Sequence, residues 1–305
     1  MLDRNAAEVS VLPRTGSAVQ AQVLGVLRWT VDFSRHKPLG AIGGAMFLVL
    51  IVVAVFSPLI APYDERATHG DFLFVPPGNT QRLLGTDDLG RDVFSRVVAG
   101  ARISLYVGIG SVLIGMTIGF VVGIASTYAG GKVDMTVQRF VDALLALPGL
   151  IIALAIMAVL GPSLNNVIIA IVIGMLAPVI RTVRSQVLSL KELDYVLAAR
   201  AIGASGTRIV FRHIAPNAFA TYLVLATYYL GFAIIIEASL SFLGVGSPPD
   251  VPSWGGMLTS ASQEHIKTGP WVGIFPGIAI FVVVLGFNLL GDALRDVFDP
   301  KLRGR

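Results

Sequence analysis

The chain has 305 residues, of which 54% are hydrophobic and only 14% are charged. Soluble domains carry about 25% charged residues, so this composition excludes an ordinary soluble protein and favours one embedded in a membrane. The formal net charge of +4 does not indicate nucleic-acid binding, because the basic residues are spread over the loops between apolar runs and form no single patch.

Six apolar runs follow one another along the chain, and a helix needs about 20 such residues to cross a bilayer. They cover residues 39–61, 103–127, 140–160, 167–180, 219–243 and 272–290. The sequence therefore predicts an all-α polytopic membrane protein with six transmembrane helices. We expect an N-terminal segment 1–38, a first span 39–61, a loop 62–102, a five-helix core 103–290 and a tail 291–305.

The loop 62–102 is expected to end in an amphipathic segment that opens with GTDDLGRD, residues 85–92. Thr86 can cap a helix here, and Asp87 and Asp88 suit the positive end of its dipole. This segment would end near Arg102, ahead of the second span. Clustered carboxylates also suggest calcium, but the spacing is not that of an EF-hand loop, so we favour the capping role.

Glycines mark the packing face of the second span. Gly108, Gly115, Gly119 and Gly123 are spaced so that they lie largely on one side of a helix, where small residues allow close helix packing. The third span is interrupted by a Pro-Gly pair at 148–149, which is tolerated only where neighbours or water satisfy the freed backbone groups.

The polar run 194–217 separates the fourth and fifth spans. It predicts two short helices separated at Gly203, the second capped by Ser205 or Thr207 and stopped by Pro216. The second helix combines basic and aromatic side chains: Arg208, Phe211, Arg212 and His213. An exposed, partly apolar and basic helix pair is typical of a docking site for another protein.

Glu237 lies in an otherwise apolar stretch of the fifth span. A carboxylate is costly there and must face a cavity or a polar partner. Two roles stay open: it lines a solute path, or it makes a structural contact between helices with Ser239 or Ser241. A proton relay would need a second buried ionisable group, and Asp142 lies too near the end of its span to serve.

Basic residues predict the orientation of the chain. Lys and Arg number 17 in segments 1–38, 127–140, 181–216 and 291–305, against 6 in the segments on the other side. Because cytoplasmic loops carry the excess of Lys and Arg, both termini and the run 194–217 are expected in the cytoplasm. Trp254 and Trp271 would then lie outside, as aromatic anchors at the membrane interface.

Several of these stretches resemble a known family. Ala198, Ala199, Gly203 and Pro216 match the "EAA" loop found in permeases of binding-protein-dependent ABC importers, with Leu197 at the place of the usual glutamate. The strings RAIGA at 200–204 and RHI at 212–214 resemble the "C" permease subunits of the dipeptide/oligopeptide/nickel branch. So do GTDDLGRDVFSR at 85–96, EASLSFLGVG at 237–246 and PSWGGML at 252–258.

The resemblance implies the type I ABC importer permease fold in the cytoplasmic membrane of a bacterium or archaeon. It implies a second homologous permease subunit, two cytoplasmic ATPase subunits and an extracytoplasmic solute-binding protein as partners, besides membrane lipid. The ATPases would hold ATP and Mg²⁺, and this chain no cofactor. Short peptides are the expected solute, with nickel chelates, glutathione and oligosaccharides as alternatives. Within 182–216 the ATPase-coupling residues would be Ala198, Ala199, Gly203, Arg208, Phe211, Arg212, His213 and Pro216.

No motif in the chain indicates catalysis. It has no phosphate-binding loop of the G-x4-G-K-[ST] type, no H-E-x-x-H and no cysteine, and its four histidines are scattered. We therefore expect a transport subunit without a catalytic or metal site. An ion-driven secondary transporter would explain the spans and Glu237 but not the docking loop. A non-transporting scaffold subunit of a membrane enzyme is the other alternative, and copurification with ATPases that carry phosphate-binding loops would argue against it.

Overall fold

The structure, a computed structural model, describes residues 34–78, 82–263 and 267–298. Within these ranges the chain forms helices and no strand, which confirms the all-α fold class. Most of the N-terminal segment 1–38 and the end of the tail 291–305 lie outside the described residues. The helices are α2 (Pro38–Val55), α3 (Ser57–Ile60), η1 (Gly70–Phe72), α4 (Val93–Ala129), α5 (Gly131–Leu145), α6 (Gly149–Leu160), α7 (Leu164–Lys191), α8 (Asp194–Ala201), α9 (Gly206–Ile209), the π-helical η2 (Val210–Ile214), α10 (Ala215–Phe242), α11 (Trp254–Gln263) and α12 (Trp271–Phe298).

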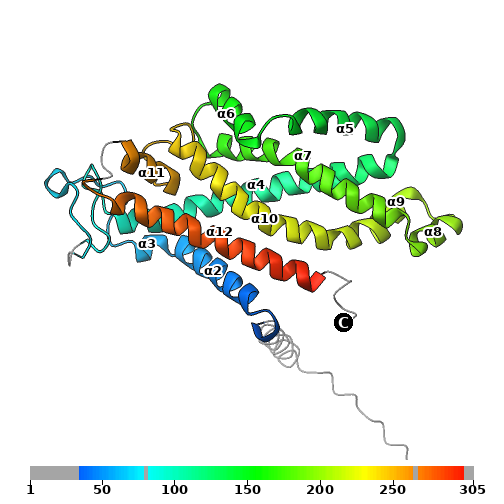
Figure 1. Cartoon of the computed structure of the whole chain (residues 1–305), viewed down its shortest axis with the longest axis horizontal. Coiled ribbons are helices and arrows are strands. Elements are labelled where there is room, and N and C mark those ends of the chain that lie inside the picture. The colour runs from blue at the N-terminus through cyan, green and yellow to red at the C-terminus, as the bar shows by residue number, and fades with distance from the viewer. Residues whose placement is uncertain (1–33, 79–81, 264–266, 299–305) are drawn as a thin grey trace, which may run out of the picture.

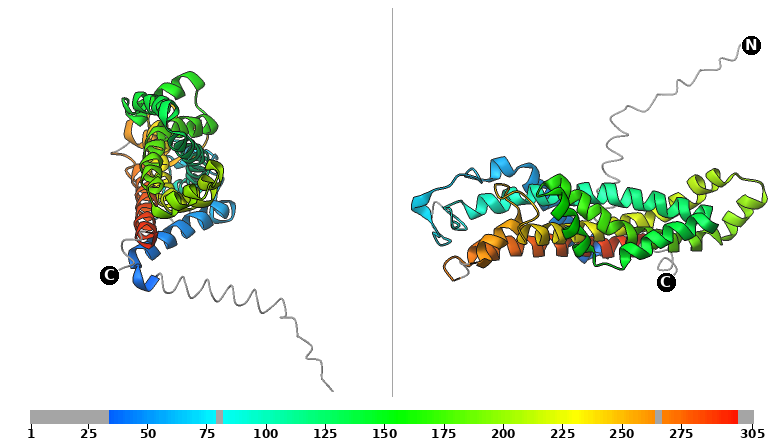
Figure 2. Two further views of the ribbon diagram at one scale, coloured as in Figure 1. Left: turned by 90° about the vertical axis from the view of Figure 1, so that its right-hand side faces the viewer. Right: turned by 90° about the horizontal axis from the view of Figure 1, so that it is seen from above.

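The long helices run side by side and give the molecule an elongated shape (Figure 1). The short helices α8 and α9 lie at one end, whereas α3 and α11 lie toward the other. Two further views show the same arrangement, with α2 packed along α12 and with α5 and α6 alongside α7 (Figure 2). The polar segments are thus sorted to the two ends of a bundle.

Five of the expected spans are single helical runs, and the remaining one corresponds to a bent pair of helices. Four single helices, α2, α4, α7 and α12, are long and apolar enough to cross a membrane, and so is the continuous helical run Gly206–Phe242. The candidate for the sixth span is the pair α5 and α6, which together are apolar enough but are bent by 85° at the break between them. The bend falls at the predicted Pro-Gly pair, and the carbonyl oxygen of Pro148 accepts the backbone N–H of Ile151 at 2.9 Å. The freed polar groups of this break are therefore partly satisfied locally.

Glycines of α4 let α7 approach it closely. A Cβ added to Gly119 would lie 2.5 Å from Cγ1 of Val179, and Gly115 and Gly123 would meet α7 in the same way. Gly108 lies two turns before Gly115 and faces α10, where an added Cβ would meet Ile234 at an ordinary van der Waals distance of 3.7 Å. The sequence thus predicted a close-packing face, and the structure assigns three of its four glycines to α7.

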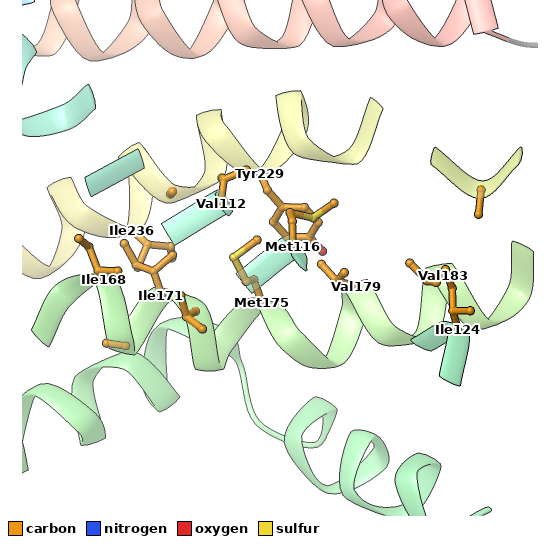
Figure 3. Close-up of a cluster of buried hydrophobic side chains, with 14 of the residues drawn as sticks. Val112, Met116, Ile124, Ile168, Ile171, Met175, Val179, Val183, Tyr229 and Ile236 are labelled. Carbon is orange, nitrogen blue, oxygen red and sulfur yellow. The ribbon is translucent and has the colours of Figure 1, made fainter. Parts of the chain in front are cut away.

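The main core fills the space where α4, α7 and α10 meet (Figure 3). Met116 of α4 and Met175 of α7 are fully buried there, beside Tyr229 of α10. Methionine is unbranched and fills irregular gaps, which suits a junction of three helices. This core continues without a break to the end of the bundle that carries α8 and α9.

The start of α4 differs from the expectation. We expected a separate amphipathic segment ending near Arg102, but α4 runs unbroken from Val93. Its N-cap is Asp92, whose carboxylate accepts the backbone N–H of Ser95 at 2.8 Å, and the predicted cap Thr86 is wrong. Thr86 instead accepts the backbone N–H of Val75 at 2.8 Å, because the loop folds back and offers it a nearer donor.

Candidate functional site

The predicted helix pair is present at one end of the bundle. Helix α8 ends at Ala201, and Gly203 follows with φ of +81°, a left-handed backbone angle that residues with a Cβ resist. Ser205 then caps α9, since its hydroxyl accepts the backbone N–H of Arg208 at 3.4 Å. Of the two capping candidates, Ser205 therefore fills the role, and the break lies at the expected glycine.

One side of this loop is part of the main core. Val196, Ala199, Ile209 and Ile214 are all buried and belong to the same apolar cluster as α4 and α7. Burying a side chain of this kind stabilises the folded state by roughly 1.5–3 kcal/mol. The loop therefore packs firmly against the ends of α4 and α7.

The other side of the loop is exposed. Phe211 is 76% exposed and Ile202 is 86% exposed, although both are large apolar residues. Ala198, Arg208 and Arg212 are also exposed, as are Gly203 and Pro216, whereas Ala199 is buried and His213 is half-buried with its ring 6.0 Å from that of Tyr195. The candidate coupling residues thus divide between a buried side, which packs on the core, and an exposed side. The exposed side carries the Phe211 ring, with Arg208 and Arg212 before and after it in the sequence.

A specific contact seats the loop on α4 and α7. The Lys191 ammonium donates a hydrogen bond to the carbonyl oxygen of Thr127 at 3.1 Å and lies 5.8 Å from the ring centre of Tyr128. A Cβ added to Gly206 would lie 3.0 Å from the same Tyr128 ring. The end of α4, the end of α7 and the start of α9 therefore meet at Tyr128.

The prediction that Pro216 stops the second helix is wrong. The chain stays helical from Gly206 to Phe242, with a π-helical turn, η2, in between. The backbone N–H of Ala215 bonds to the carbonyl of Val210, five residues back, so α10 starts afresh at Ala215. Pro216 then falls in the first turn, where its missing N–H costs nothing. Asn217 adds a hydrogen bond from its side chain to the carbonyl of His213 at 2.6 Å.

Glu237 is fully buried in α10. The Ser241 hydroxyl donates to its carboxylate at 2.8 Å, and the backbone N–H of Ser247 donates to Ser241 at 3.0 Å. The hydroxyl of Ser247 in turn donates to Ser253, the residue before α11, at 2.7 Å. This polar chain ties α10 to α11. Ser239 takes no part in it, because its hydroxyl donates to the carbonyl of Ile235 in its own helix.

We expect Glu237→Ala to lower the melting temperature of the solubilised protein. The variant removes the carboxylate that accepts the Ser241 hydroxyl and leaves a cavity where a fully buried side chain was, and large-to-small substitutions at buried sites cost about 2–5 kcal/mol. Ser239→Ala is the matched control, since its hydroxyl is exposed and only bonds back to its own helix, and it should leave the melting temperature unchanged. An unchanged melting temperature for Glu237→Ala together with an altered range of transported solutes would instead identify Glu237 as a wall of the solute path.

Sequence reasoning missed the buried ion pairs at the opposite end. Asp87 accepts a hydrogen bond from Arg91 at 2.6 Å and lies 3.7 Å from Arg96, and all three side chains are almost fully buried. Asp87 and Asp88 therefore pair with arginines of the loop and of α4 and do not cap a helix. Among the described residues no group of three or more His, Cys, Asp and Glu could hold a metal ion.

The two tryptophans make contacts that the sequence did not indicate. Trp254 is only 2% exposed, and its ring N–H donates to the carbonyl of Val97 at 2.9 Å. The ring N–H of Trp271 donates to the carbonyl of Thr86 at 3.0 Å. Each indole thus fastens α11 or α12 to the segment around the start of α4. Because Trp254 is buried, it is not an aromatic anchor directed at lipid, whereas Trp271 is only half-buried and its role as an anchor stays a prediction.

Comparison with known proteins decides the family. The family described as "Binding-protein-dependent transport system inner membrane component" matches residues 115–304. The chain belongs to this family. The family described as "N-terminal TM domain of oligopeptide transport permease C" matches residues 32–77. The matches at the first span and over the core therefore both indicate a transport permease.

Relatives match over nearly the whole chain. It is 43% identical over 278 residues to the di/tripeptide transport system permease protein DppC of Pseudomonas aeruginosa (strain UCBPP-PA14), covering 89% of this chain and 91% of the relative. It is 41% identical over 284 residues to the dipeptide transport system permease protein DppC of Alkalihalophilus pseudofirmus, covering 92% and 93%. It is 46% identical over 266 residues to the glutathione transport system permease protein GsiD of Escherichia coli O6:K15:H31, covering 87% of each.

Membership of this family defines the class of function. The protein is a permease subunit of an ABC importer, a multi-pass inner-membrane protein with the type I permease fold. It is a transport subunit and not an enzyme in its own right.

Proposed function

We propose that the protein is one of two permease subunits that import short peptides. Two ATPases drive the transport from the cytoplasmic side, and an extracytoplasmic binding protein delivers the solute. ATP and Mg²⁺ belong to the ATPases. The observation that carries the coupling part of the proposal is Phe211, an exposed aromatic ring on a loop whose other side is buried in the core.

Alternating access is the mechanism we infer. Closure of the ATPase dimer on ATP moves the α8–α9 loop, and the loop moves α4 and α7 with it through Tyr128 and Lys191. The spans then switch from an inward-facing to an outward-facing arrangement, the binding protein releases its solute, and hydrolysis resets the assembly. The loop is well suited to this because it moves as one body with the helix ends on which it is seated.

The names of the relatives favour short peptides as the transported solute. Two relatives are named as di- or tripeptide permeases and others as glutathione permeases, and glutathione is itself a small peptide. The test is uptake of a labelled dipeptide into proteoliposomes that hold the complete importer and its binding protein. We expect uptake that requires internal ATP and is unaffected by collapse of ion gradients. Uptake driven by an ion gradient without ATP would contradict the proposal.

The orientation follows from the charge count and gives a separate prediction. A reporter enzyme that is active only outside the cytoplasm should be active when fused after Pro77 or Trp254 and inactive when fused after Ser205 or Arg303. The reason is the excess of Lys and Arg on the side that carries the α8–α9 loop. The opposite pattern of activity would overturn both the orientation and the coupling role of the loop.

A further inference from the structure

A groove of about 650 Å³ lies between α2, α3 and the first part of α4. Most of its lining is apolar, and the residues that line it are Ala54, Val55, Pro58, Arg102, Leu105, Tyr106, Ile109 and Gly110. This volume lies within the range of about 300–1,000 Å³ that is typical of small-molecule pockets. The groove is remote from the α8–α9 loop, which lies at the other end of the bundle (Figure 1).

Arg102 is the charged residue in this lining. Its side chain is exposed, and it makes no hydrogen bond or ion pair with the described ranges 34–78, 82–263 and 267–298. The neighbouring Tyr106 is already engaged, since its hydroxyl donates to the side-chain oxygen of Asn165 at 2.8 Å. A guanidinium presents five N–H donors in a planar fork, and for Arg102 none of them has an acceptor among the described residues.

The position of Arg102 along α4 places it at a membrane boundary. It is the last charged residue before an uncharged run that extends through residues 103–131. On the opposite wall of the groove α2 ends at Val55, and the helix is interrupted at Phe56 before α3, which adds Pro58 to the lining. Basic side chains at the ends of spans extend to the level of the lipid headgroups.

We propose that this groove binds an anionic phospholipid. The phosphate would accept hydrogen bonds from the Arg102 fork, a geometry that suits guanidinium and phosphate. An acyl chain would lie between Val55 and Ile109, along the apolar part of the groove. Bound in this way, the lipid holds α2 and α3 against α4.

A transported peptide fits the groove less well. A zwitterion carries an ammonium group as well as a carboxylate, and no acidic side chain lines the groove to receive it. A phospholipid offers one anionic group and a long apolar chain, which match the single guanidinium and the apolar walls. The proposal depends on the membrane location of the protein and not on which solute it carries.

The test is lipid retention by the complete importer in detergent, measured by native mass spectrometry after incubation with an equimolar mixture of phosphatidylglycerol and phosphatidylcholine. We expect wild type to retain phosphatidylglycerol preferentially and Arg102→Gln to retain about fivefold less, the factor that corresponds to roughly 1 kcal/mol for one basic side chain near anionic lipid. Val55→Trp, which keeps Arg102 but fills the apolar part, should also lower retention.

Two further variants make the outcome decisive. Lys132→Gln removes an exposed charge outside the groove and should retain lipid as wild type does. Arg102→Lys keeps the charge and should retain more phosphatidylglycerol than Arg102→Gln. If Arg102→Gln assembles poorly, Arg102→Lys is compared with wild type in its place. Equal retention by wild type and Arg102→Gln would reduce the groove to ordinary annular contact and overturn the proposal. Loss of the second permease from Arg102→Gln complexes with unchanged lipid retention would show that Arg102 pairs with that subunit instead.

Discussion

An importer that carries Gly43→Ala will melt several degrees below one that carries Gly44→Ala. A Cβ at Gly43 would lie 2.5 Å from the carbonyl oxygen of Gly286 and 2.6 Å from the backbone nitrogen of Leu290, where α2 crosses α12. These are backbone atoms and cannot turn aside, so the two helices must separate. Overpacking of this kind costs about 1–3 kcal/mol. The melting temperature of the solubilised importer is the measurement.

Gly44 is a matched control for this substitution. It is the next residue of the same helix, and a Cβ there meets only the end of the Leu290 side chain, at 3.8 Å. Alanine favours helix over glycine by about 1 kcal/mol, and the gain is the same at both positions, so it cancels in the comparison. Equal melting temperatures for the two variants would show that α2 does not cross α12 at Gly43.

The features that could be predicted from the sequence are those that depend on neighbouring residues alone. The number of spans follows from the length of the apolar runs, and the break at Gly203 follows from a left-handed angle that glycine adopts readily. The face formed by Gly115, Gly119 and Gly123 follows from helix periodicity. The pattern does not say which helix lies against that face, and Gly43 lacks a comparable run, so its crossing with α12 escaped prediction.

The features that escaped prediction depend on contacts that form only when the loops fold, whether the partner is near or far in the sequence. The Trp254 ring donates to a carbonyl 157 residues away and the Trp271 ring to one 185 residues away. Asp87 reads as a dipole-stabilising residue until the loop folds back and places it beside Arg91 and Arg96. Each of these side chains has a plausible local role, and tertiary contacts replaced that role with another.

The candidate coupling site falls between these cases. The sequence indicated which residues form the loop, and their polarity indicated that it lies outside the membrane. The structure added which side of the loop is seated, through Val196 and Ile214, and which side is free, through Phe211. It also corrected Pro216, whose effect on the helix is absorbed by the π turn before it.

We expect Phe211→Ala to uncouple ATP hydrolysis from uptake. The ring is 76% exposed and lies in a segment flanked by Arg208 and Arg212, so a partner that covers it would bury a large apolar group within a basic rim. Truncating an aromatic hot spot costs about 2 kcal/mol or more, which corresponds to a loss of roughly thirtyfold in docking affinity. In proteoliposomes, uptake should therefore fall strongly while ATP hydrolysis persists and the protein still reaches the membrane. Phe140→Ala is the control, because that ring is 71% exposed on α5, outside the loop.

A crosslink distinguishes docking from an indirect effect of the mutation. The chain has no cysteine, so Thr207→Cys or Arg212→Cys introduces its one thiol. We expect either variant to crosslink to the ATPase subunit and the yield to change with nucleotide, since closure of the ATPase dimer moves the loop. Arginines at such a rim contribute orientation and association rate more than affinity, so the Arg212 variant should still assemble. If neither position crosslinks and Phe211→Ala transports normally, the α8–α9 loop is not the coupling element, and the exposed ring is covered by something other than the ATPase.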